Sequence, residues 1–231
     1  GQEYPNLEYF VMDGGSTDGS AEIIRRYSDR LTFWVSEPDG GQSKAINRAF
    51  ARATGDILCW INSDDYLLPG SLRRVADTLG GRISASALVQ GHCLLFRDGG
   101  NEAWPRFADA GDPEKLRRID TIVQPSAFWT RVLWEKTGPL DDTLHFAFDW
   151  DWFIRANQHC RFENIPHFLS GYRLHAAHKT GSGSSKRWQE LVDVVSRHSG
   201  AEVAAQLEWL MAREEVWPEL RRYSTATRVL R

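Results

Sequence analysis

The chain has 231 residues, of which 42% are hydrophobic, and its formal net charge is -3. This length allows one substantial core with a small appended lobe. The slightly acidic balance speaks against a nucleic-acid-binding surface, which needs a clear basic excess. The three cysteines have no paired spacing, so they indicate neither a zinc knuckle nor a disulfide framework, and a reduced, cytoplasmic compartment is expected. No apolar run approaches the roughly 20 residues that span a bilayer.

The first 80 residues alternate between apolar runs and segments with helical spacing. Strands are predicted at 7–13, 31–38 and 56–62, each followed by a helix, at 21–27, 43–54 and 71–80. Three repeats of strand and helix are typical of an α/β fold with a mostly parallel central sheet flanked by helices. Ligands of such sheets bind at the carboxyl ends of the strands, so the residues after each strand are the first candidates for a site.

The second half is less regular. Apolar strands are predicted at 87–96 and 121–129, and helices at 131–138 and 150–158. The polar stretch 101–120 predicts a long loop with one short helix. Residues 171–185 become rich in glycine and serine and predict a loop or linker, and the tail from Lys186 shows two amphipathic helical patterns.

Two adjacent carboxylates, Asp64 and Asp65, end the apolar run in CWINSDDYLLPG (59–70). Like charges side by side are tolerable if a hard divalent cation neutralises them, and such cations bridge diphosphates. This reasoning favours a metal site that also binds a nucleoside diphosphate. The alternative is that both acids only cap the turn before the next helix.

Asp13 ends the first predicted strand and opens the glycine-rich turn DGGSTDGS. Backbone N–H groups of such a strand-to-helix turn can face an anion. The spacing differs from the GxGxxG dinucleotide motif, so an ordinary tight turn is an equal alternative.

Six motifs of the chain, in this order and spacing, resemble those of family 2 glycosyltransferases. They are YPNLEYFVMDGGSTDGS, SEPDGGQSKAINRAFARATGD, NSDD, VQPSAFW, FDWDWFIRA and GYRLHAAHKT, and the resemblance covers roughly residues 4–180. It implies the GT-A nucleotide-diphospho-sugar transferase fold and a divalent metal, Mg²⁺ or Mn²⁺. It also implies transfer of a sugar with inversion at the anomeric carbon.

The resemblance assigns donor-side roles. Asp13 is similar to the family acid that contacts the base or ribose of the donor. Asp64 and Asp65 resemble the family's DxD-type acids, which hold the metal and the diphosphate, although Asn62 replaces the first acid of that motif. Gln42 and Lys44, in SEPDGGQSKAINRAFARATGD, are assigned to donor binding as well.

The acceptor side is assigned from the later motifs. Asp149 in FDWDWF stands in the place of the catalytic base, and Asp151 is expected either to bind the acceptor or to position the helix. Gln124 lies near the expected acceptor cleft and is predicted to bind a hydroxyl, or else to complete a strand ladder. His175 stands where some relatives present a histidine to the metal; a solvated loop side chain is the alternative. Lys179 is a candidate for phosphate contact.

The resemblance thus predicts a metal-dependent inverting transfer from a nucleoside-diphosphate sugar to a sugar or lipid-linked hydroxyl acceptor, in polysaccharide or glycolipid biosynthesis. An inverting transfer needs one carboxylate to take the acceptor proton and positive charge on the departing diphosphate. Two alternatives remain open. One is a catalytically weak nucleotide-sugar-binding module, and the other is a metal-dependent nucleotidyltransferase, which would leave Asp149 without a task.

The predicted catalytic domain is 1–180, with a nucleotide-sugar-binding half at 1–85 and an acceptor-binding half at 86–180. A linker and helical tail are predicted at 181–231. Members of the resembled family begin with one more strand, which carries a short polar motif, and a helix. That unit would precede Gly1, so either the chain is an excerpt of a longer protein or the unit is missing.

The end of the tail, residues 220–231, holds four arginines and no acid. Each basic residue near an anionic membrane surface contributes about 1 kcal/mol of attraction. The tail therefore predicts weak, salt-sensitive contact with the inner face of the membrane. The alternative is that it packs on the core or is disordered.

Overall fold

The computed structural model describes residues 2–97, 102–109, 112–175, 179 and 185–212. The chain forms two compact units, Gly1–Gly183 and Ser184–Arg231. The sequence places the corresponding boundary after residue 180, and the further division at residue 85 stays a prediction. The arginine-rich end of the tail lies outside the described residues.

The first unit opens with a parallel pair of strands. β1 (Phe10–Asp13) and β2 (Phe33–Ser36) pair in register from Phe10 with Phe33 to Asp13 with Ser36, and α1 (Ser20–Arg26) connects them. Because parallel strands end at the same edge, Asp13 and Ser36 are neighbours at the carboxyl end. The helix α2 (Gln42–Phe50) follows β2. These elements match the first two predicted strand–helix repeats.

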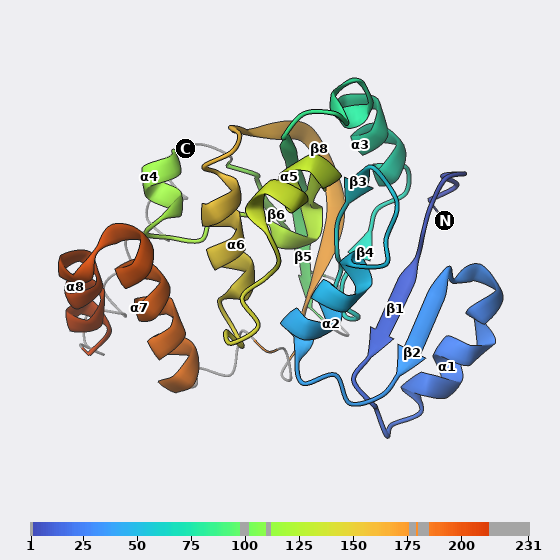
Figure 1. The fold of residues 1–231 in the computed structure, drawn as a ribbon, viewed down its shortest axis with the longest axis horizontal. Helices are drawn as coiled ribbons and strands as arrows, with labels where there is room; N and C mark the ends of the chain where they lie inside the picture. The colour runs from blue at the N-terminus through green and yellow to red at the C-terminus, as the bar shows by residue number, and fades with distance from the viewer. Residues whose placement is uncertain (1, 98–101, 110–111, 176–178, 180–184, 213–231) are drawn as a thin grey trace. The chain divides into compact units, whose positions relative to one another are not determined.

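A six-stranded sheet forms the rest of the scaffold (Figure 1). Its path runs β3-β7-β5-β8-β4, and β6 pairs with β5. The strands are β3 (Ile57–Leu58), β4 (Tyr66–Leu67), β5 (Leu88–Arg97), β6 (Ala103–Arg106), β7 (Ala127–Thr130) and β8 (Phe162–Leu174). Only β5 and β8 pair in parallel; every other pairing in this sheet is antiparallel. The structure thus has the predicted α/β fold with a central sheet flanked by helices, but this sheet is mixed rather than mostly parallel, because hairpins and returning strands replace the strand–helix crossovers after residue 80.

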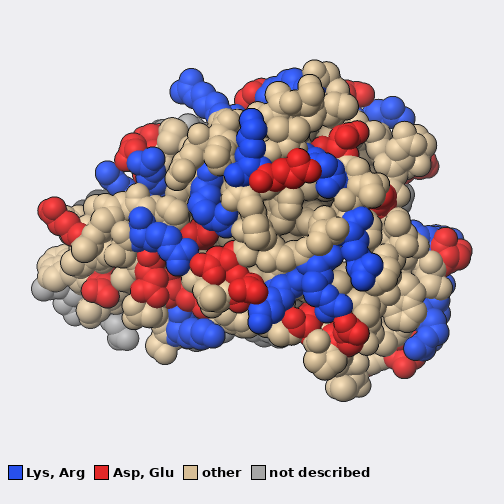
Figure 2. Space-filling view, in the orientation of Figure 1, with Lys and Arg blue, Asp and Glu red and all other residues tan. Residues whose placement is uncertain are grey.

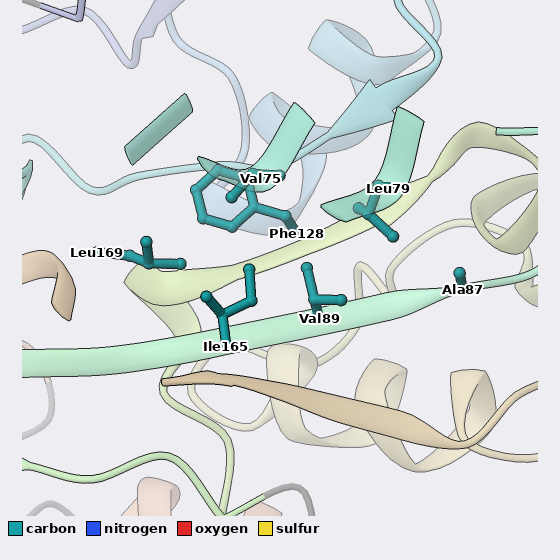
Figure 3. Close-up of a cluster of buried hydrophobic side chains, with 7 residues drawn as sticks. All are labelled: Val75, Leu79, Ala87, Val89, Phe128, Ile165 and Leu169. Carbon is teal, nitrogen blue, oxygen red and sulfur yellow. The ribbon is translucent and has the colours of Figure 1, made fainter. Parts of the chain in front are cut away.

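One face of the six-stranded sheet packs against α3 (Ser71–Leu79). Figure 3 shows the side chains of this helix pointing toward those of the strands beneath it. Burying this apolar surface contributes roughly 25 cal/mol per Å² removed from water. The cluster consists of Val75, Leu79, Ala87, Val89, Phe128, Ile165 and Leu169.

The opposite face carries an aromatic cluster. Along β7 successive side chains alternate in direction, so Phe128 joins the α3 cluster while Trp129 meets Trp152 at 4.8 Å and Trp60 at 5.2 Å between ring centroids. Trp152 belongs to α6 (Phe148–Ala156), which covers this face together with α5 (Arg131–Thr137). The packing of aromatic rings fixes α6 on the sheet.

Three strands were not predicted from sequence: the short β4, and also β6 and β8. β6 lies within the expected loop 101–120, which also contains the short helix α4 (Pro113–Leu116). β8 runs for 13 residues and ends inside the expected loop 171–185. The last residues of β8, 171–174, are the first residues of the GYRLHAAHKT motif, and they lie next to the candidate site.

The second unit contains α7 (Ser185–Ser199) and α8 (Ala201–Met211), which pack against each other. Gly200 connects them with a φ of 91°, a conformation that favours glycine. Among the described residues no helix has the length and apolar character needed to cross a bilayer. Figure 2 shows acidic and basic side chains interspersed on the visible face, in keeping with the small net charge.

Candidate functional site

Asp13 is held at the carboxyl end of β1 by a network of hydroxyl and backbone donors. The Ser16 hydroxyl donates to Oδ1, the Ser16 N–H donates to Oδ2 at 3.0 Å, and the Ser36 hydroxyl donates to Oδ2 at 2.6 Å. The Ser16 and Ser36 hydroxyls lower the pKa of Asp13, because they stabilise its charged form. Asp13 is thus an ionised acceptor, as donor binding through a ribose hydroxyl requires.

The loops after β1 and β2 meet beside Asp13. A side chain on Gly14 would bring its Cβ within 3.1 Å of an Asp39 carboxylate oxygen, so a larger residue would require Asp39 to shift. The same Asp39 accepts the N–H of Gly41 at 2.8 Å, immediately before α2 begins. This contact links the end of β1 to the first turn of α2, which carries Gln42 and Lys44.

The turn after β3 separates its two adjacent acids. Asp64 Oδ2 lies 3.0 Å from Nε2 of His175, although the two residues are 111 positions apart. Asp65 turns the other way: its Oδ1 accepts the N–H of Arg173 at 3.1 Å, and Asn62 donates to its Oδ2 at 3.4 Å. Asp64 and His175 remain 31% and 25% exposed at the side chain, so both are accessible to a ligand.

Burial raises the pKa of Asp65 to about 6, and the Arg173 N–H offsets part of this rise. The charge of the adjacent Asp64 raises it further. Asp65 therefore anchors the turn to the end of β8, and Asp64 is the more accessible of the two acids.

A chain of amides connects the donor-side residues. Lys179 Nζ donates to Gln42 Oε1 at 3.0 Å, and Gln42 Nε2 donates to Asn62 Oδ1 at 2.7 Å. Asn62 in turn donates to Gln124 Oε1 at 3.5 Å, and Gln124 Nε2 donates to the carbonyl of Trp60 at 2.8 Å. The structure therefore brings Gln42, Asn62 and Gln124 together with the turn of Asp64 and Asp65.

Lys44 and Gln124, which were predicted to bind the donor and the acceptor, make other contacts within the protein. Lys44 is exposed on α2, and its side-chain carbons lie against Gly40. Gln124 is committed to the donor-side amide chain through Asn62, rather than to a strand ladder. Lys179 also lies over the rings of Phe146 and Phe148, at 5.5 and 5.4 Å from their centroids, which holds its ammonium group near the start of α6.

Asp149 lies half-buried in the first turn of α6. Its Oδ1 accepts the N–H of Trp150 at 2.8 Å, and the Trp150 indole donates to the carbonyl of Leu116 at 2.7 Å. The positive end of the helix stabilises a carboxylate at this position. The assignment of Asp149 as the general base stays a prediction, because a base must also reach the proton that it abstracts.

A second carboxyl group, Asp120, lies near Asp149. Asp120 is exposed as a residue, but the protein atoms around its carboxyl group and the charge of Asp149 both raise its pKa. Asp120 Oδ1 accepts the N–H of Ile122 at 3.0 Å, and Arg106 donates to the carbonyl of the same residue at 3.2 Å. Asp120 and Arg106 are thus both held at the backbone of Ile122, and the charge of Arg106 lowers the pKa of Asp120 in part.

Asp151 is 0% exposed and forms an ion pair with Arg155, whose Nε lies 2.8 Å from its Oδ2. A fully buried carboxylate that is already paired is not accessible to a diffusing acceptor. The geometry therefore favours the positioning role over the expected acceptor contact.

Comparison with known proteins agrees with this geometry. The profile of glycosyl transferase family 2 matches residues 1–130, more than half of the chain. The chain belongs to this family. The uncharacterized glycosyltransferase YwdF of Bacillus subtilis is 25% identical over 194 residues, which cover 80% of this chain and 70% of that protein. The chondroitin synthase of Pasteurella multocida is 26% identical over 182 residues, but they cover only 18% of that enzyme, against 75% of this chain.

A solved structure shows the same fold. The mannosyltransferase PcManGT from Pyrobaculum calidifontis, in complex with GDP-Man and Mn²⁺, has a TM-score of 0.56 and 19% identity. The likeness covers 100% of this chain and 74% of that one. It confirms the predicted GT-A fold for this family 2 glycosyltransferase.

A divalent cation at the donor side of this glycosyltransferase stays a prediction. Within the described ranges no group of three or more His, Cys, Asp or Glu side chains is arranged to hold a metal. Asp64 and His175 nevertheless offer one oxygen and one nitrogen ligand side by side. Mg²⁺ and related hard ions are commonly held by one or two carboxylates together with substrate phosphates, so Asp64 suits such an ion when a diphosphate completes the shell, and His175 would add a nitrogen ligand.

Three residues beside the site were not singled out from the sequence: Asp120, near Asp149; Asn47, whose amide binds the Leu140 backbone; and Arg155, the partner of Asp151. Asp120 directly precedes the apolar segment TIVQPSAFW, which is a detectable signal. Asn47 and Arg155 look like ordinary polar positions of amphipathic helices, and only their partners in space distinguish them. No local pattern in the sequence marks either one.

Proposed function

We propose that this family 2 glycosyltransferase moves a glycosyl group from a nucleoside-diphosphate sugar to an acceptor hydroxyl, with inversion and with a bound Mg²⁺ or Mn²⁺. The observation that supports this most is the meeting of Asp64 and His175 at 3.0 Å, beside the amide chain of Gln42, Asn62 and Gln124. Residues from three distant parts of the chain converge there. Their types suit a diphosphate and its cation.

On the donor side, Asp64 and His175 would hold the metal. The bound cation would supply positive charge to the departing diphosphate. Lys179, held by Gln42, adds a second positive charge close to the same residues. Asp13, kept ionised by its serine partners, accepts hydrogen bonds from the nucleoside.

On the acceptor side, Asp149 takes the proton from the acceptor hydroxyl. As the oxygen of that hydroxyl bonds to the anomeric carbon, the bond from this carbon to the diphosphate oxygen breaks, and the diphosphate leaves with the electron pair. A direct displacement of this kind inverts the anomeric centre, and it needs a single base. Asp149 is that base in our proposal, and Asp120 lies beside it.

The biological setting that we propose is the assembly of a polysaccharide or glycolipid. The similarity to a chondroitin synthase supports a polymer-forming role, although the chain matches only a small part of that enzyme. The three cysteines are free thiols, which fits a reducing, cytoplasmic compartment. Weak membrane contact through the arginine-rich tail stays a prediction.

A two-stage experiment tests the proposed function. Thermal unfolding is followed with UDP, GDP, CDP and dTDP, each with Mg²⁺, Mn²⁺ or EDTA, because a bound ligand stabilises the folded state by mass action. The nucleotide that stabilises only with metal selects the sugar donors, and release of nucleoside diphosphate then reports turnover. Proton NMR of the first product assigns its anomeric configuration.

Matched variants assign the result to the site. Asp64→Asn and His175→Ala should remove the metal-dependent stabilisation, whereas Asp77→Asn, an exposed acid on α3, should keep it. Metal-dependent binding without turnover of any donor would favour a binding module. Release of pyrophosphate from a nucleoside triphosphate would favour a nucleotidyltransferase instead.

A further inference from the structure

The side chains of α6 bind three consecutive backbone carbonyls of the segment that follows α5. Arg155 donates from Nη1 to Thr137 O at 2.8 Å and from Nη2 to Pro139 O at 2.9 Å, and Trp152 donates from its indole to Gly138 O at 2.9 Å. The remaining Arg155 donor, Nε, is occupied by the buried Asp151. All three nitrogens of the guanidinium group are therefore used, and its plane is fixed.

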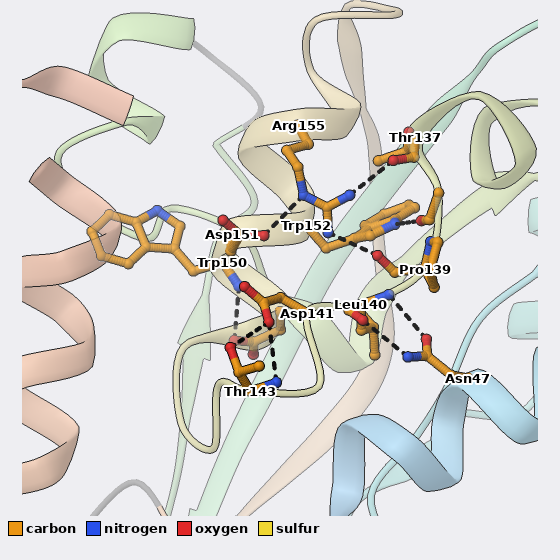
Figure 4. Close-up of polar contacts among 12 residues, drawn as sticks. Asn47, Thr137, Pro139, Leu140, Asp141, Thr143, Trp150, Asp151, Trp152 and Arg155 are labelled. Atoms are coloured by element: carbon orange, nitrogen blue, oxygen red, sulfur yellow. Dashed lines mark hydrogen bonds and ion pairs between the residues drawn. The ribbon is translucent and has the colours of Figure 1, made fainter. Parts of the chain in front are cut away.

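The next residue of that segment is bound from the other side by α2. Asn47 accepts the Leu140 N–H at Oδ1 and donates from Nδ2 to the Leu140 carbonyl, both at 2.9 Å. Figure 4 shows the segment lying between the two helices, with Arg155 on one side and Asn47 on the other. Residues 137–140 thus form a strut in which every carbonyl has a side-chain partner.

The backbone of the strut is itself restricted. Gly138 has a φ of 80°, which other residues rarely adopt, and Leu140 is buried. The backbone of residues 137–140 can therefore change conformation little. A displacement of α2 would accordingly move α6, and a displacement of α6 would move α2. Buried, hydrogen-bonded arrangements of this kind tend to hold one geometry.

Each end of the strut meets a helix of the candidate site. α6 carries Asp149 two residues before Asp151, and α2 carries Gln42 five residues before Asn47. Gln42 belongs to the amide chain beside Asp64 and Asp65. The strut therefore connects the proposed base to the donor side without passing through either ligand.

We propose that Asn47 and Arg155 are positioning residues, which fix Asp149 relative to the donor through the strut of residues 137–140. This inference rests on the proposed function. Positioning of a base matters because a misplacement of about 1 Å can cost about 10²-fold in rate. Neither residue touches the reacting atoms; both act through Asp149.

A double-mutant cycle tests whether Asn47 acts through Asp149. The readout is the release of nucleoside diphosphate from whichever UDP- or GDP-sugar the wild-type chain hydrolyses fastest, measured as kcat and donor KM. Asn47→Ala should lower kcat about tenfold and leave KM unchanged, since the donor contacts stay in place. In an Asp149→Asn background the same substitution should change kcat by less than about twofold, because the group that it positions is already lost.

Arg48→Ala provides the matched control on α2. Arg48 follows Asn47 directly and pairs at the surface with Glu37, away from the strut. This variant should leave kcat unchanged in both backgrounds. If Asn47→Ala fails to fold, Arg155→Lys takes its place in the cycle, because the lysine keeps the charge beside Asp151 but cannot bind both carbonyls at once.

An equal proportional loss of kcat in the two backgrounds would overturn the inference and leave a purely structural role. So would a rise in donor KM at constant kcat. If Asp149→Asn alone has no effect on kcat, the assignment of the base fails first. The two failures are therefore distinguishable.

Discussion

Two pairs of acids look alike in the sequence and behave differently in the molecule. In the turn after β3, Asp65 is tied to the end of β8 by a backbone N–H, and Asp64 remains partly exposed beside His175. In α6, Asp151 is fully buried against Arg155, and Asp149 stays half-buried in the first turn. In each pair one acid holds the local backbone and its neighbour faces the site.

The physical basis of the anchoring differs between the two pairs. Asp65 relies on neutral donors and sits where burial disfavours its charge, so its pKa is raised to about 6. Asp151 has a cationic partner on its own helix, one turn away. The loop that contains Asp65 therefore depends on contacts with a distant strand, β8. The first turn of α6 is stabilised largely by contacts within the helix and with the strut of residues 137–140.

The largest expected effect is on stability, from breaking the buried pair. Arg155→Met leaves the Asp151 carboxylate buried without its cation, and the free energy of unfolding should fall by about 3–5 kcal/mol. Arg82→Met, which breaks the exposed pair with Glu163, should cost less than about 1 kcal/mol. Urea unfolding of both variants checks the difference; equal small losses would show that Asp151 is not an anchor.

The next effect is on turnover and distinguishes Asp149 from Asp151. Asp149→Asn keeps the shape of the side chain but removes the proton acceptor, so kcat for donor turnover should fall about 10²-fold or more, with donor binding unchanged. Asp151→Asn should mainly lower stability. A greater loss of kcat in Asp151→Asn than in Asp149→Asn would exchange the two roles.

The third effect separates Asp64 from Asp65. At a nucleoside diphosphate concentration of about 100 times Kd, binding stabilises the fold by about 2.7 kcal/mol. Asp64→Asn should remove the part of this stabilisation that requires Mn²⁺, because it removes a proposed metal ligand. Asp65→Asn should retain more than half of it, since its side chain is occupied by Arg173 and Asn62. Thermal unfolding with and without Mn²⁺ measures both, and a reversed order would assign the metal to Asp65.

The smallest expected effect concerns the pH dependence of stability at Asp120, because this residue is exposed and solvent screens the groups that shift its pKa. Its pKa rises from 3.8 to about 7 on folding, so the folded state binds the proton more tightly than the unfolded chain. Stability should therefore decrease as the pH rises from about 4 to about 7, and level off above. Asp120→Asn should reduce this slope, and urea unfolding at pH 5 and pH 8 compares the two proteins. An unchanged slope would show that Asp120 ionises normally.

The sequence predicted the elements whose apolar pattern is local. The strand–helix repeats that contain β1, α2 and α3 follow from periodicity, and so does the helix of FDWDWFIRA. β6 was missed because Pro105 argues against a strand, yet among the described residues β6 pairs with β5 alone, and such an edge strand accepts proline. β8 was missed because its pairing with β5 across the whole sheet outweighs a weak local pattern that includes Gly171.

The sequence by itself determined the family, the fold and the set of acids from which the site is built. The tertiary structure alone decided which of those acids are tied to other parts of the protein, as Asp65 and Asp151 are, and which remain partly exposed. The reason is that exposure and pairing depend on groups far away in the chain: His175 lies 111 residues from Asp64, and Arg173 lies 108 residues from Asp65. Adjacent carboxylates look equivalent in the sequence. In the folded chain, residues at and just after the end of β8 bind each of them separately, so the two side chains point in different directions.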